Sequence, residues 1–427
     1  MTLTTPITVV RGRFLDIQKT VSQAQDIIDQ VRYIEDGVLI AKQGQIRWFG
    51  SWDDAQAHLP ANVEIQHYPE QLIIPGMIDT HIHFPQTEMV GAYGEQLLSW
   101  LNTYTFPTEI QFQDPSYAQK IAEFFIQELL KNGTTTALVF CTVHPESVDA
   151  LFEAAAQQQM RLIAGKVMMD RHAPEALCDT AESAYNDSKA LIGKWHGQGR
   201  ALYAITPRFA PTSTPEQLER AGQLKAEFPD VYVHTHLSEN KDEIAWVKDL
   251  FPEQKGYLDV YHHYGLTGNR SVFAHCVHLE DAEWQCMHET DSAIAFCPTS
   301  NLFLGSGLFP LKKTWQQQVK VGLGTDIGAG TSFSLLQTVN EAYKVQQLQG
   351  DKLSAFESLY HATLGGAKAL DLDDKLGNFN VGKEADFVVL NLKPTALQQL
   401  RQSRAKSLED SLFALFTMGD DRNIEAT

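Results

Sequence analysis

The stretch IIPGMIDTHIHFPQ, residues 73–86, places two histidines one residue apart, directly after an apolar run and an aspartate. Side chains alternate between the two faces of a β-strand, so His81 and His83 would point the same way from the end of one strand. Two neutral imidazoles held that close favour a shared proton or a shared metal ion. Taken alone, the pair is equally compatible with two surface histidines in a loop, and the rest of the chain has to decide.

Six further residues with polar, ionisable side chains lie near the ends of other apolar runs. Each alone has a plain structural interpretation, because a lone histidine on an apolar strand is more often a hydrogen-bonded core residue and an aspartate can cap a helix. Found together at matching ends of several strands, they favour a metal site. The residues are Arg208, His234, His236, Glu239, His275 and Asp326.

Eight apolar, strand-like runs alternate with amphipathic helical stretches from residue 72 onwards. This alternation is typical of βα units, and eight of them predict an α/β fold, a (β/α)8 TIM-like barrel. A doubly wound open sheet is the alternative, but no GxGxxG follows an early strand. The active site of such a barrel lies at the carboxyl ends of the strands, where these polar residues fall. The runs are 72–84, 133–143, 161–170, 201–211, 231–240, 271–279, 292–301 and 319–328.

The two ends of the chain have a different texture. Short alternating runs precede residue 72, with KQGQ (residues 42–45) as a plausible hairpin, and LGNFNVGKEADFVVLNL returns to the same pattern near the end. We therefore predict a small β-sandwich domain built from both termini. The predicted domains are its N-terminal part at 1–71, the metal-dependent barrel at 72–372, and its C-terminal part with a terminal helix at 373–427.

The composition excludes several classes of protein. The hydrophobic share of 43% and the charged share of 20% are those of a soluble globular protein, and the net charge of −19 argues against a nucleic-acid or anionic-membrane partner. No apolar run reaches the roughly 18 residues of a membrane span, and the start lacks the pattern of a signal peptide. The five cysteines form no CxxC pair, which favours a reducing compartment. We expect a cytoplasmic protein.

The donor types narrow the choice of metal. Three imidazoles and one carboxylate, with no thiolate, suit zinc or iron(II). Many barrels of this kind hold two metals bridged by a carbamylated lysine at the end of the fourth strand, but here that strand ends in ITPRFAP, with Arg208 at the position. One metal ion is therefore favoured, and Lys166 is interpreted as structural or as paired with a carboxylate. The other zinc deaminase pattern, HxE followed by PCxxC, is absent.

Several motifs resemble known proteins. PGMIDTHIHFPQ, HTHLSEN, AHCVHL and GLGTDIGAGTSFSLLQ resemble the amidohydrolase superfamily, and FPQTEM, TPRFAPTST, FCPTSNLFLGSGLFP and MGDDRNIE resemble its guanine deaminase family. The resemblance covers nearly the whole chain. It implies one zinc ion per subunit, with Fe2+ as the alternative, a purine substrate and a homodimer. The family usually continues past GDDRNIE into a final strand, whereas this sequence stops at NIEAT, so the small β domain is expected to lack that strand.

The resemblance also assigns roles to residues. Glu239 matches the glutamate that shuttles protons, and His275 matches the histidine that polarises the attacked centre. Asp326 would accept a proton from a metal-activated water, and the expected reaction is hydrolysis of guanine to xanthine and ammonia. The residues implied to bind the metal are His81, His83, His236 and Asp326. The residues implied to hold the purine are Gln86, Arg208, Phe209, His236 and Asp326.

Gln86, Arg208 and Phe209 supply the argument for guanine. The planar fork of an arginine suits the O6 and N7 acceptors of guanine, and Phe209 offers an apolar or stacking face. The same machinery acting on another amino-heterocycle, such as 8-oxoguanine, a pterin, cytosine or a triazine, is the nearest alternative. A non-enzymatic scaffold is a second alternative, although every expected ligand position is filled. His172 receives no role, and His234 is interpreted as barrel packing or as support for a metal ligand.

Overall fold

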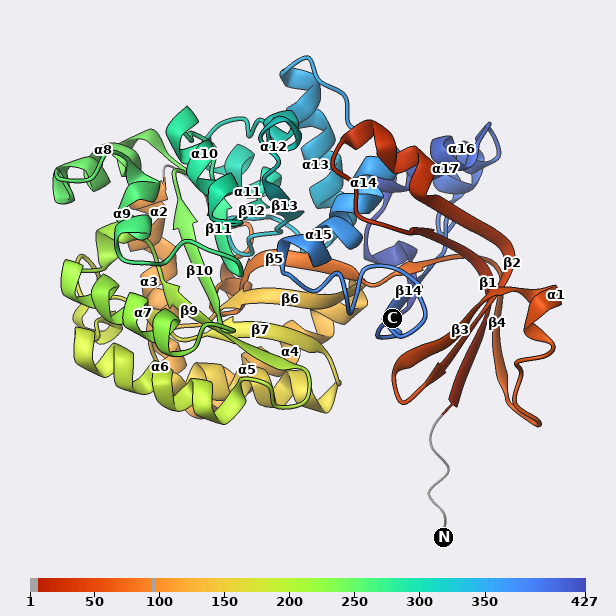
Figure 1. Ribbon diagram of the computed structural model, residues 1–427, viewed down its shortest axis with the longest axis horizontal. Coiled ribbons are helices and arrows are strands. Elements are labelled where there is room, and N and C mark those ends of the chain that lie inside the picture. The colour runs from red at the N-terminus through yellow and green to blue at the C-terminus, as the bar shows by residue number, and fades with distance from the viewer. Residues whose placement is uncertain (1–6, 94–96) are drawn as a thin grey trace, which may run out of the picture.

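Eight strands pair in parallel to form a nearly closed barrel, which makes up the larger part of the computed structural model in Figure 1. The structure describes residues 7–93 and 97–427, so the first six residues of the predicted domain 1–71 lie outside the described residues. Each of the eight predicted runs contains one barrel strand, and the predicted barrel is confirmed. The strands are β5 (Met77–His83), β6 (Thr134–Phe140), β7 (Arg161–Gly165), β9 (Ala201–Pro207), β10 (Tyr232–Leu237), β11 (Ser271–His275), β12 (Ala293–Phe296) and β13 (Lys320–Leu323). A short strand, β8 (Val167–Met168), pairs with β9.

Hydrogen bonds between the ends of the first and last strands close the barrel. The backbone N–H of Asp326, just after β13, donates to the carbonyl of His81 at 2.9 Å. The N–H of His83 donates to the carbonyl of Ile327, also at 2.9 Å, and the Thr80 hydroxyl donates to the carbonyl of Leu323 at 3.0 Å. This closure places the residues that follow β13 directly beside the histidines of β5.

Helices follow the barrel strands and surround them (Figure 1). They are α4 (Pro115–Lys131), α5 (Pro145–Gln157), α6 (Ala181–Trp195), α7 (Pro215–Glu227), α8 (Lys241–Leu250), α9 (Tyr257–His263), α10 (Asp281–Glu289), α11 (Pro298–Phe303), α12 (Leu311–Gln317), α13 (Leu335–Leu348), α14 (Ala355–Ala362) and α15 (Leu364–Ala369). Single turns of 3-10 helix follow β8 and β9, at η5 (Glu175–Leu177) and η6 (Ala210–Thr212).

Helix α4 shows how local sequence sets these elements. The Asp114 side chain accepts from the N–H of Ser116 and so caps the helix, with Pro115 at the first helical position. Ile121, Phe125 and Leu129 recur at intervals of four and are buried. Beyond the helix end, Gly133 has the φ of +78° that favours glycine, as the sequence predicts for a C-terminal stop.

A string of short helical turns lies between β5 and α4. One of them, η3, is a π-helix, a rare form that is frequent at functional sites. Described residues of this segment line the cavity discussed below. The turns are η2 (Phe84–Met89), α2 (Leu97–Trp100), η3 (Leu101–Thr105), α3 (Phe106–Glu109) and η4 (Ile110–Gln113).

Both ends of the chain contribute to a separate six-stranded sheet, ordered β15-β14-β4-β1-β2-β3, so the predicted small β domain is present as one sheet. The KQGQ hairpin joins β2 to β3, with Gln43 and Gly44 both at positive φ, as a tight hairpin turn requires. The predicted domain boundary at residues 71 and 72 falls within β4. The strands are β1 (Ile7–Ile17), β2 (Val31–Lys42), β3 (Gln45–Ser51), β4 (Ile65–Pro75), β14 (Phe387–Leu390) and β15 (Ile424–Ala426).

Short helices accompany the sheet. Residues Ile424–Ala426, within NIEAT, form β15, an edge strand that pairs antiparallel with β14, so the sheet has a final strand, contrary to the expectation from the sequence. Helix η1 lies between β1 and β2, α1 follows β3, and the others lie between β14 and β15. They are η1 (Ala24–Gln30), α1 (Trp52–Ala55), α16 (Ala396–Gln402), α17 (Leu408–Met418) and η7 (Asp421–Asn423).

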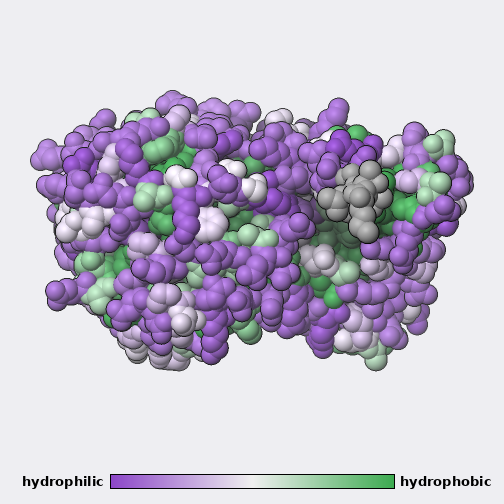
Figure 2. Space-filling model, turned by 90° about the horizontal axis from the view of Figure 1, so that it is seen from below, coloured by the Kyte–Doolittle hydropathy of each residue, from purple (hydrophilic) through white to green (hydrophobic). Residues whose placement is uncertain are grey.

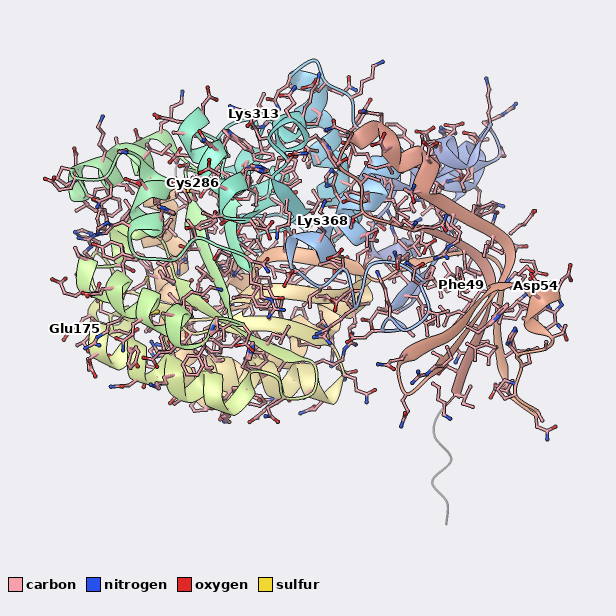
Figure 3. All side chains as sticks on the ribbon, viewed as in Figure 1. Phe49, Asp54, Glu175, Cys286, Lys313 and Lys368 are labelled. Atoms are coloured by element: carbon pink, nitrogen blue, oxygen red, sulfur yellow. The ribbon has the colours of Figure 1, made fainter. Side chains whose placement is uncertain are left out.

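The two parts of the molecule lie at opposite ends of its long axis. Figure 3 places Phe49 and Asp54 on the small-sheet side and Glu175 at the far side of the barrel. Hydrophilic residues cover most of the face seen in Figure 2, with hydrophobic residues scattered among them. Among residues 7–93 and 97–427, no helix is long and apolar enough to cross a membrane.

Candidate metal centre and active site

Four side chains from three places in the barrel converge at the carboxyl ends of its strands. His81 and His83 lie at the end of β5, His236 lies on β10, and Asp326 follows β13. One ligand atom from each lies within 4.8 Å of the other three. Nε2 of His81 is 3.1 Å and Nε2 of His83 is 3.3 Å from Oδ1 of Asp326. Nε2 of His83 is 3.2 Å from Nε2 of His236.

In two of the histidines, the Nδ1 atom already has a hydrogen-bond partner. Nδ1 of His236 donates to the carbonyl of Arg208 at 2.6 Å, which leaves Nε2 with a free lone pair. Nδ1 of His81 lies 2.8 Å from Nε2 of His234. Nε2 of His81 is buried and makes no well-aligned hydrogen bond among the described residues, although Oδ1 of Asp326 lies 3.1 Å away. A lone pair buried among other ligand atoms is the arrangement that a metal ion satisfies, so these residues fit one.

The electrostatics of the cluster agree with this fit. Burial lowers the pKa of His83 to about 3 and the pKa of His236 well below its usual value, so both imidazoles are neutral. Burial alone would raise the pKa of Asp326, but His81 and His83 outweigh it and hold the pKa well below its usual range. Neutral imidazoles and an ionised carboxylate are the protonation states that metal binding requires.

Two further residues face the cluster from neighbouring strands. Glu239 follows β10, and its Oε2 lies 3.5 Å from Nε2 of His275 at the end of β11. Nδ1 of His275 pairs with Oδ1 of Asn301 at 2.9 Å, which directs Nε2 towards Glu239 and Asp326. Burial and the charge of Asp326 raise the pKa of Glu239 to about 8, against the opposing hydrogen bond from Ser306. The raised pKa favours the protonated form of Glu239, which is the form that can donate a proton.

The backbone at these strand ends is unusual. His275 has a φ of +71° and Asp326 a φ of +53°, in the left-handed region that residues other than glycine rarely adopt. Such conformations persist where the surrounding structure fixes them, and they concentrate at active sites.

A cavity opens beside the cluster, and His83, His236 and Asp326 of the cluster form part of its wall. Gln86 reaches it from η2, and Arg208 and Phe209 reach it from the end of β9. Apolar residues complete much of its wall. They are Leu97, Trp100, Leu101, Leu304 and Ala329.

Glu109, on α3, is a residue that sequence reasoning missed. Its carboxylate is fully buried and accepts hydrogen bonds from Nη1 of Arg208 at 2.9 and 2.8 Å. It also accepts from Nε2 of Gln86 at 3.2 Å. The only local signal is a glutamate in the apolar stretch TFPTEIQF, and nothing in that stretch indicates which cation it pairs with.

The remaining residues of interest lie in supporting positions. Nζ of Lys166 pairs with Oδ2 of Asp179 at 2.5 Å, which confirms the interpretation of a lysine paired with a carboxylate. His234 contacts the metal-ligand candidate His81 through its Nε2. Nδ1 of His172 contacts the carbonyl of Pro211 at 2.7 Å, and its ring lies against Trp246.

Comparison with known proteins identifies the family. The model of the amidohydrolase family matches residues 72–427. The chain belongs to the amidohydrolase family. The guanine deaminase of Escherichia coli (strain K12) is 63% identical over 418 residues, covering 98% of this chain and 95% of that protein. Within the family, this chain and the E. coli guanine deaminase are therefore similar over nearly their full length.

Solved structures of family members agree with this relationship. The E. coli guanine deaminase structure matches with a TM-score of 0.95 and 61% identity, covering 98% of this chain and 96% of that chain. The guanine deaminase of C. acetobutylicum, solved with guanine in its active site, matches with a TM-score of 0.88 and 32% identity, covering 98% of each chain.

Proposed function

We propose that this protein hydrolyses guanine to xanthine and ammonia with the help of one bound metal ion. The observation that carries the proposal is that one cavity is lined by the metal-ligand cluster and also by Gln86, Arg208 and Phe209. The 63% identity to the E. coli guanine deaminase supports the same activity.

We propose zinc as the ion, with Fe2+ as the alternative. Bonds of about 2.0 to 2.1 Å at tetrahedral angles would place neighbouring ligand atoms about 3.3 to 3.4 Å apart. The three close distances in the cluster are 3.1, 3.2 and 3.3 Å. Zinc bound by His81, His83, His236 and Asp326 would lower the pKa of water to about 7, which makes water a nucleophile at neutral pH.

The side chains around the cavity account for the proton movements of the reaction. Asp326 accepts the proton that the attacking water loses. Glu239, protonated at neutral pH, donates to a ring nitrogen of guanine and so makes C2 electrophilic. Water oxygen bonds to C2, Glu239 regains a proton from Asp326 and passes it to the amine, and the C2–amine bond breaks. The proton of the new C2 hydroxyl then returns to Glu239, which leaves xanthine, ammonia and a protonated Glu239. His275 donates to the oxygen at the tetrahedral centre and stabilises its charge.

The opposite wall of the cavity holds the purine. Arg208 offers N–H donors to O6 and N7 of guanine, and Phe209 offers an apolar face. Adenine has no O6 acceptor, so it would leave a buried guanidinium donor unpaired, which penalises its binding. Gln86 is held by Gly328, whose N–H donates to its Oε1 at 3.1 Å, and it contributes a second, amide contact to the ring.

The test is ammonia release, together with loss of ultraviolet absorbance, by the metal-loaded protein on a panel of amino-heterocycles. The panel contains guanine, adenine, cytosine, 8-oxoguanine, a pterin and a triazine. Turnover of guanine far faster than the others is the expected result. Activity on another member with none on guanine would refute the assignment of the purine-binding residues, and inactivity on all would refute the proposed function.

A homodimeric assembly and a location in the cytoplasm are also proposed. They rest on the guanine deaminase resemblance and on the acidic, cysteine-poor composition. Light scattering of the purified protein and fractionation of cells test the two points separately.

A further inference from the structure

The pair formed by Arg208 and Glu109 is buried beside the cavity. Arg208 is 3% exposed and Glu109 is not exposed at all. Arg208 lines the cavity, whereas Glu109 lies behind it and does not. Glu109 therefore influences a ligand only through the groups it holds.

Glu109 holds two groups that the proposed function assigns to the purine. Both of its oxygens bind Nη1 of Arg208, and Oε1 also binds Nε2 of Gln86. The N–H of Gly328 donates to Oε1 of Gln86. The amide of Gln86 is therefore fixed in one orientation, in which its nitrogen faces Glu109 and its oxygen faces Gly328. The ring of Phe106 lies 5.7 Å from Cζ of Arg208, so α3 supplies two of the contacts around the guanidinium.

The Arg208–Glu109 ion pair also affects which ligands the cavity attracts. An uncompensated guanidinium in a buried cavity would attract anions and would be costly to desolvate. Glu109 supplies the matching negative charge at hydrogen-bond distance, so Arg208 offers donors to the cavity while its positive charge is balanced. The other carboxyl groups that line the cavity, Glu239, Glu243 and Asp326, are unchanged when Glu109 alone is substituted. A neutral heterocycle then binds to the donors, and an anionic one gains no attraction from an unpaired cation.

We infer that Glu109 is a positioning residue that sets the specificity of the cavity for neutral purines, by orienting Arg208 and Gln86 and by cancelling the charge of Arg208. The inference rests on the proposed guanine deamination and deepens it. It bears on product release too, since xanthine loses a ring proton more readily than guanine does. An arginine whose charge is balanced by Glu109 therefore gives the ionised product no net attraction.

The test compares the wild-type protein with Glu109→Gln, each loaded with zinc. The substitution keeps the shape of the side chain and removes its charge. KM for guanine should rise by about tenfold to a hundredfold, with a smaller change in kcat, because charge-assisted hydrogen bonds that orient the purine donors are weakened. In the variant, the ratio of the inhibition constant of xanthine to the KM of guanine should fall as the pH is raised from mildly acidic to mildly alkaline.

Glu88→Gln is the matched control. Glu88 is exposed on η2, close in sequence to Gln86, and its carboxylate accepts from the hydroxyl of Tyr117. The control also removes one carboxylate charge from the string of short helical turns between β5 and α4, but it leaves the contacts of Arg208 unchanged. If both variants behave alike, or if xanthine inhibition of Glu109→Gln follows the wild-type pH dependence, the role of Glu109 is refuted while guanine deamination stands. A wild-type protein inactive on guanine would refute both proposals.

A double variant separates the positioning role from a merely structural one. In Arg208→Gln, the further change Glu109→Gln should have a much smaller effect on KM than it has in the wild type, because its partner is already gone. If Glu109→Gln alone is unfolded, the double variant should fold, since it contains no unpaired buried charge. Equal effects of Glu109→Gln in both backgrounds, or failure of both variants to fold, would overturn the inference.

Discussion

Glu239 carries the clearest sign of chemistry at the scale of one residue. Its carboxyl group is buried, and burial together with Asp326 raises its pKa to about 8. A carboxylic acid with a raised pKa can act as a general acid, and we propose that Glu239 is the proton donor of the site and that Asp326, whose pKa is lowered, is the proton acceptor.

The substitution Glu239→Gln should lower kcat for guanine by about 10² to 10⁴-fold, because the amide cannot transfer a proton. Metal content should remain at the wild-type level, since Glu239 is outside the ligand cluster. Steady-state kinetics and metal analysis of the same preparation make the check. Glu289→Gln, at an exposed position on α10, serves as the control. A variant that retains wild-type kcat would contradict the assigned role.

At the scale of elements, the closure between β5 and the end of β13 determines the metal site. Gly324 lies in this junction, where its N–H donates to the carbonyl of Phe296. A Cβ at this position would lie 2.9 Å from Cβ of His81 and 2.9 Å from Sγ of Cys297. Real Cβ contacts of that length essentially do not occur, so a side chain here has to displace β5 and the histidine it carries.

The substitution Gly324→Ala should weaken metal binding by about tenfold to a hundredfold, as loss of the support around a metal ligand does. Competition with a chromogenic zinc chelator measures the change. Gly193→Ala on α6 is the matched control, because a Cβ there meets nothing within 4 Å. The control should be more stable by about 0.5 to 1 kcal/mol, since alanine favours a helix. Unchanged zinc affinity in Gly324→Ala would show that the junction tolerates the displacement.

At the scale of the whole molecule, ion pairs join the small sheet to the barrel. Arg161 on β7 donates from Nε to Glu384 at 3.0 Å, and Arg200 donates from Nη2 to Glu384 at 2.5 Å. Arg200 also donates from Nη1 to Asp386 at 2.9 Å. Burial alone would raise the pKa of Glu384, but the hydrogen bonds and charges of the two arginines outweigh it and lower the pKa.

This lowered pKa predicts how stability depends on pH. A carboxyl group whose pKa is lower in the folded state stabilises the protein above its unfolded pKa of about 4.3, and the contribution is lost as the pH falls through the folded value. Glu384→Gln should therefore reduce the free energy of unfolding by about 1 to 3 kcal/mol at neutral pH. The difference from the wild type should shrink under acid.

Urea unfolding at several pH values, with exposed Glu35→Gln on β2 as control, measures this difference. A wild-type advantage that stays constant from neutral to strongly acidic pH would contradict the assignment to the Glu384 carboxylate.

Metal removal is the second prediction for the whole molecule. Chelation should abolish guanine deamination and lower Tm, and added zinc should restore both. An ion that binds only the folded state stabilises it by about 2.7 kcal/mol when its free concentration is 100 times Kd. Activity and thermal unfolding across a zinc titration provide the measurement. Full activity in protein shown by elemental analysis to be metal-free would refute the metal-dependent mechanism.

The sequence by itself determined the features that repeat or stand close together along the chain. Continuous apolar runs marked all eight barrel strands, because a parallel strand that is buried on both faces needs such a run wherever it occurs. His81 and His83 are neighbours in any strand conformation, so their shared direction follows from spacing alone. The remaining ligand and purine-binding candidates came from strand ends and from the family resemblance. Their catalytic roles stay predictions.

Only the tertiary structure decided which distant groups meet. Asp326 lies beside the histidines because the hydrogen bonds of barrel closure join the two ends of one sheet, and no local pattern encodes that contact. Glu109 pairs with Arg208 across 99 residues, from a helix too short and irregular to show a period. A buried charge is stable only beside its partner, and the partner is fixed by packing rather than by position in the chain. The residues of the candidate metal cluster could therefore be named from the sequence, whereas their meeting in space and the pairing of Arg208 with Glu109 could not.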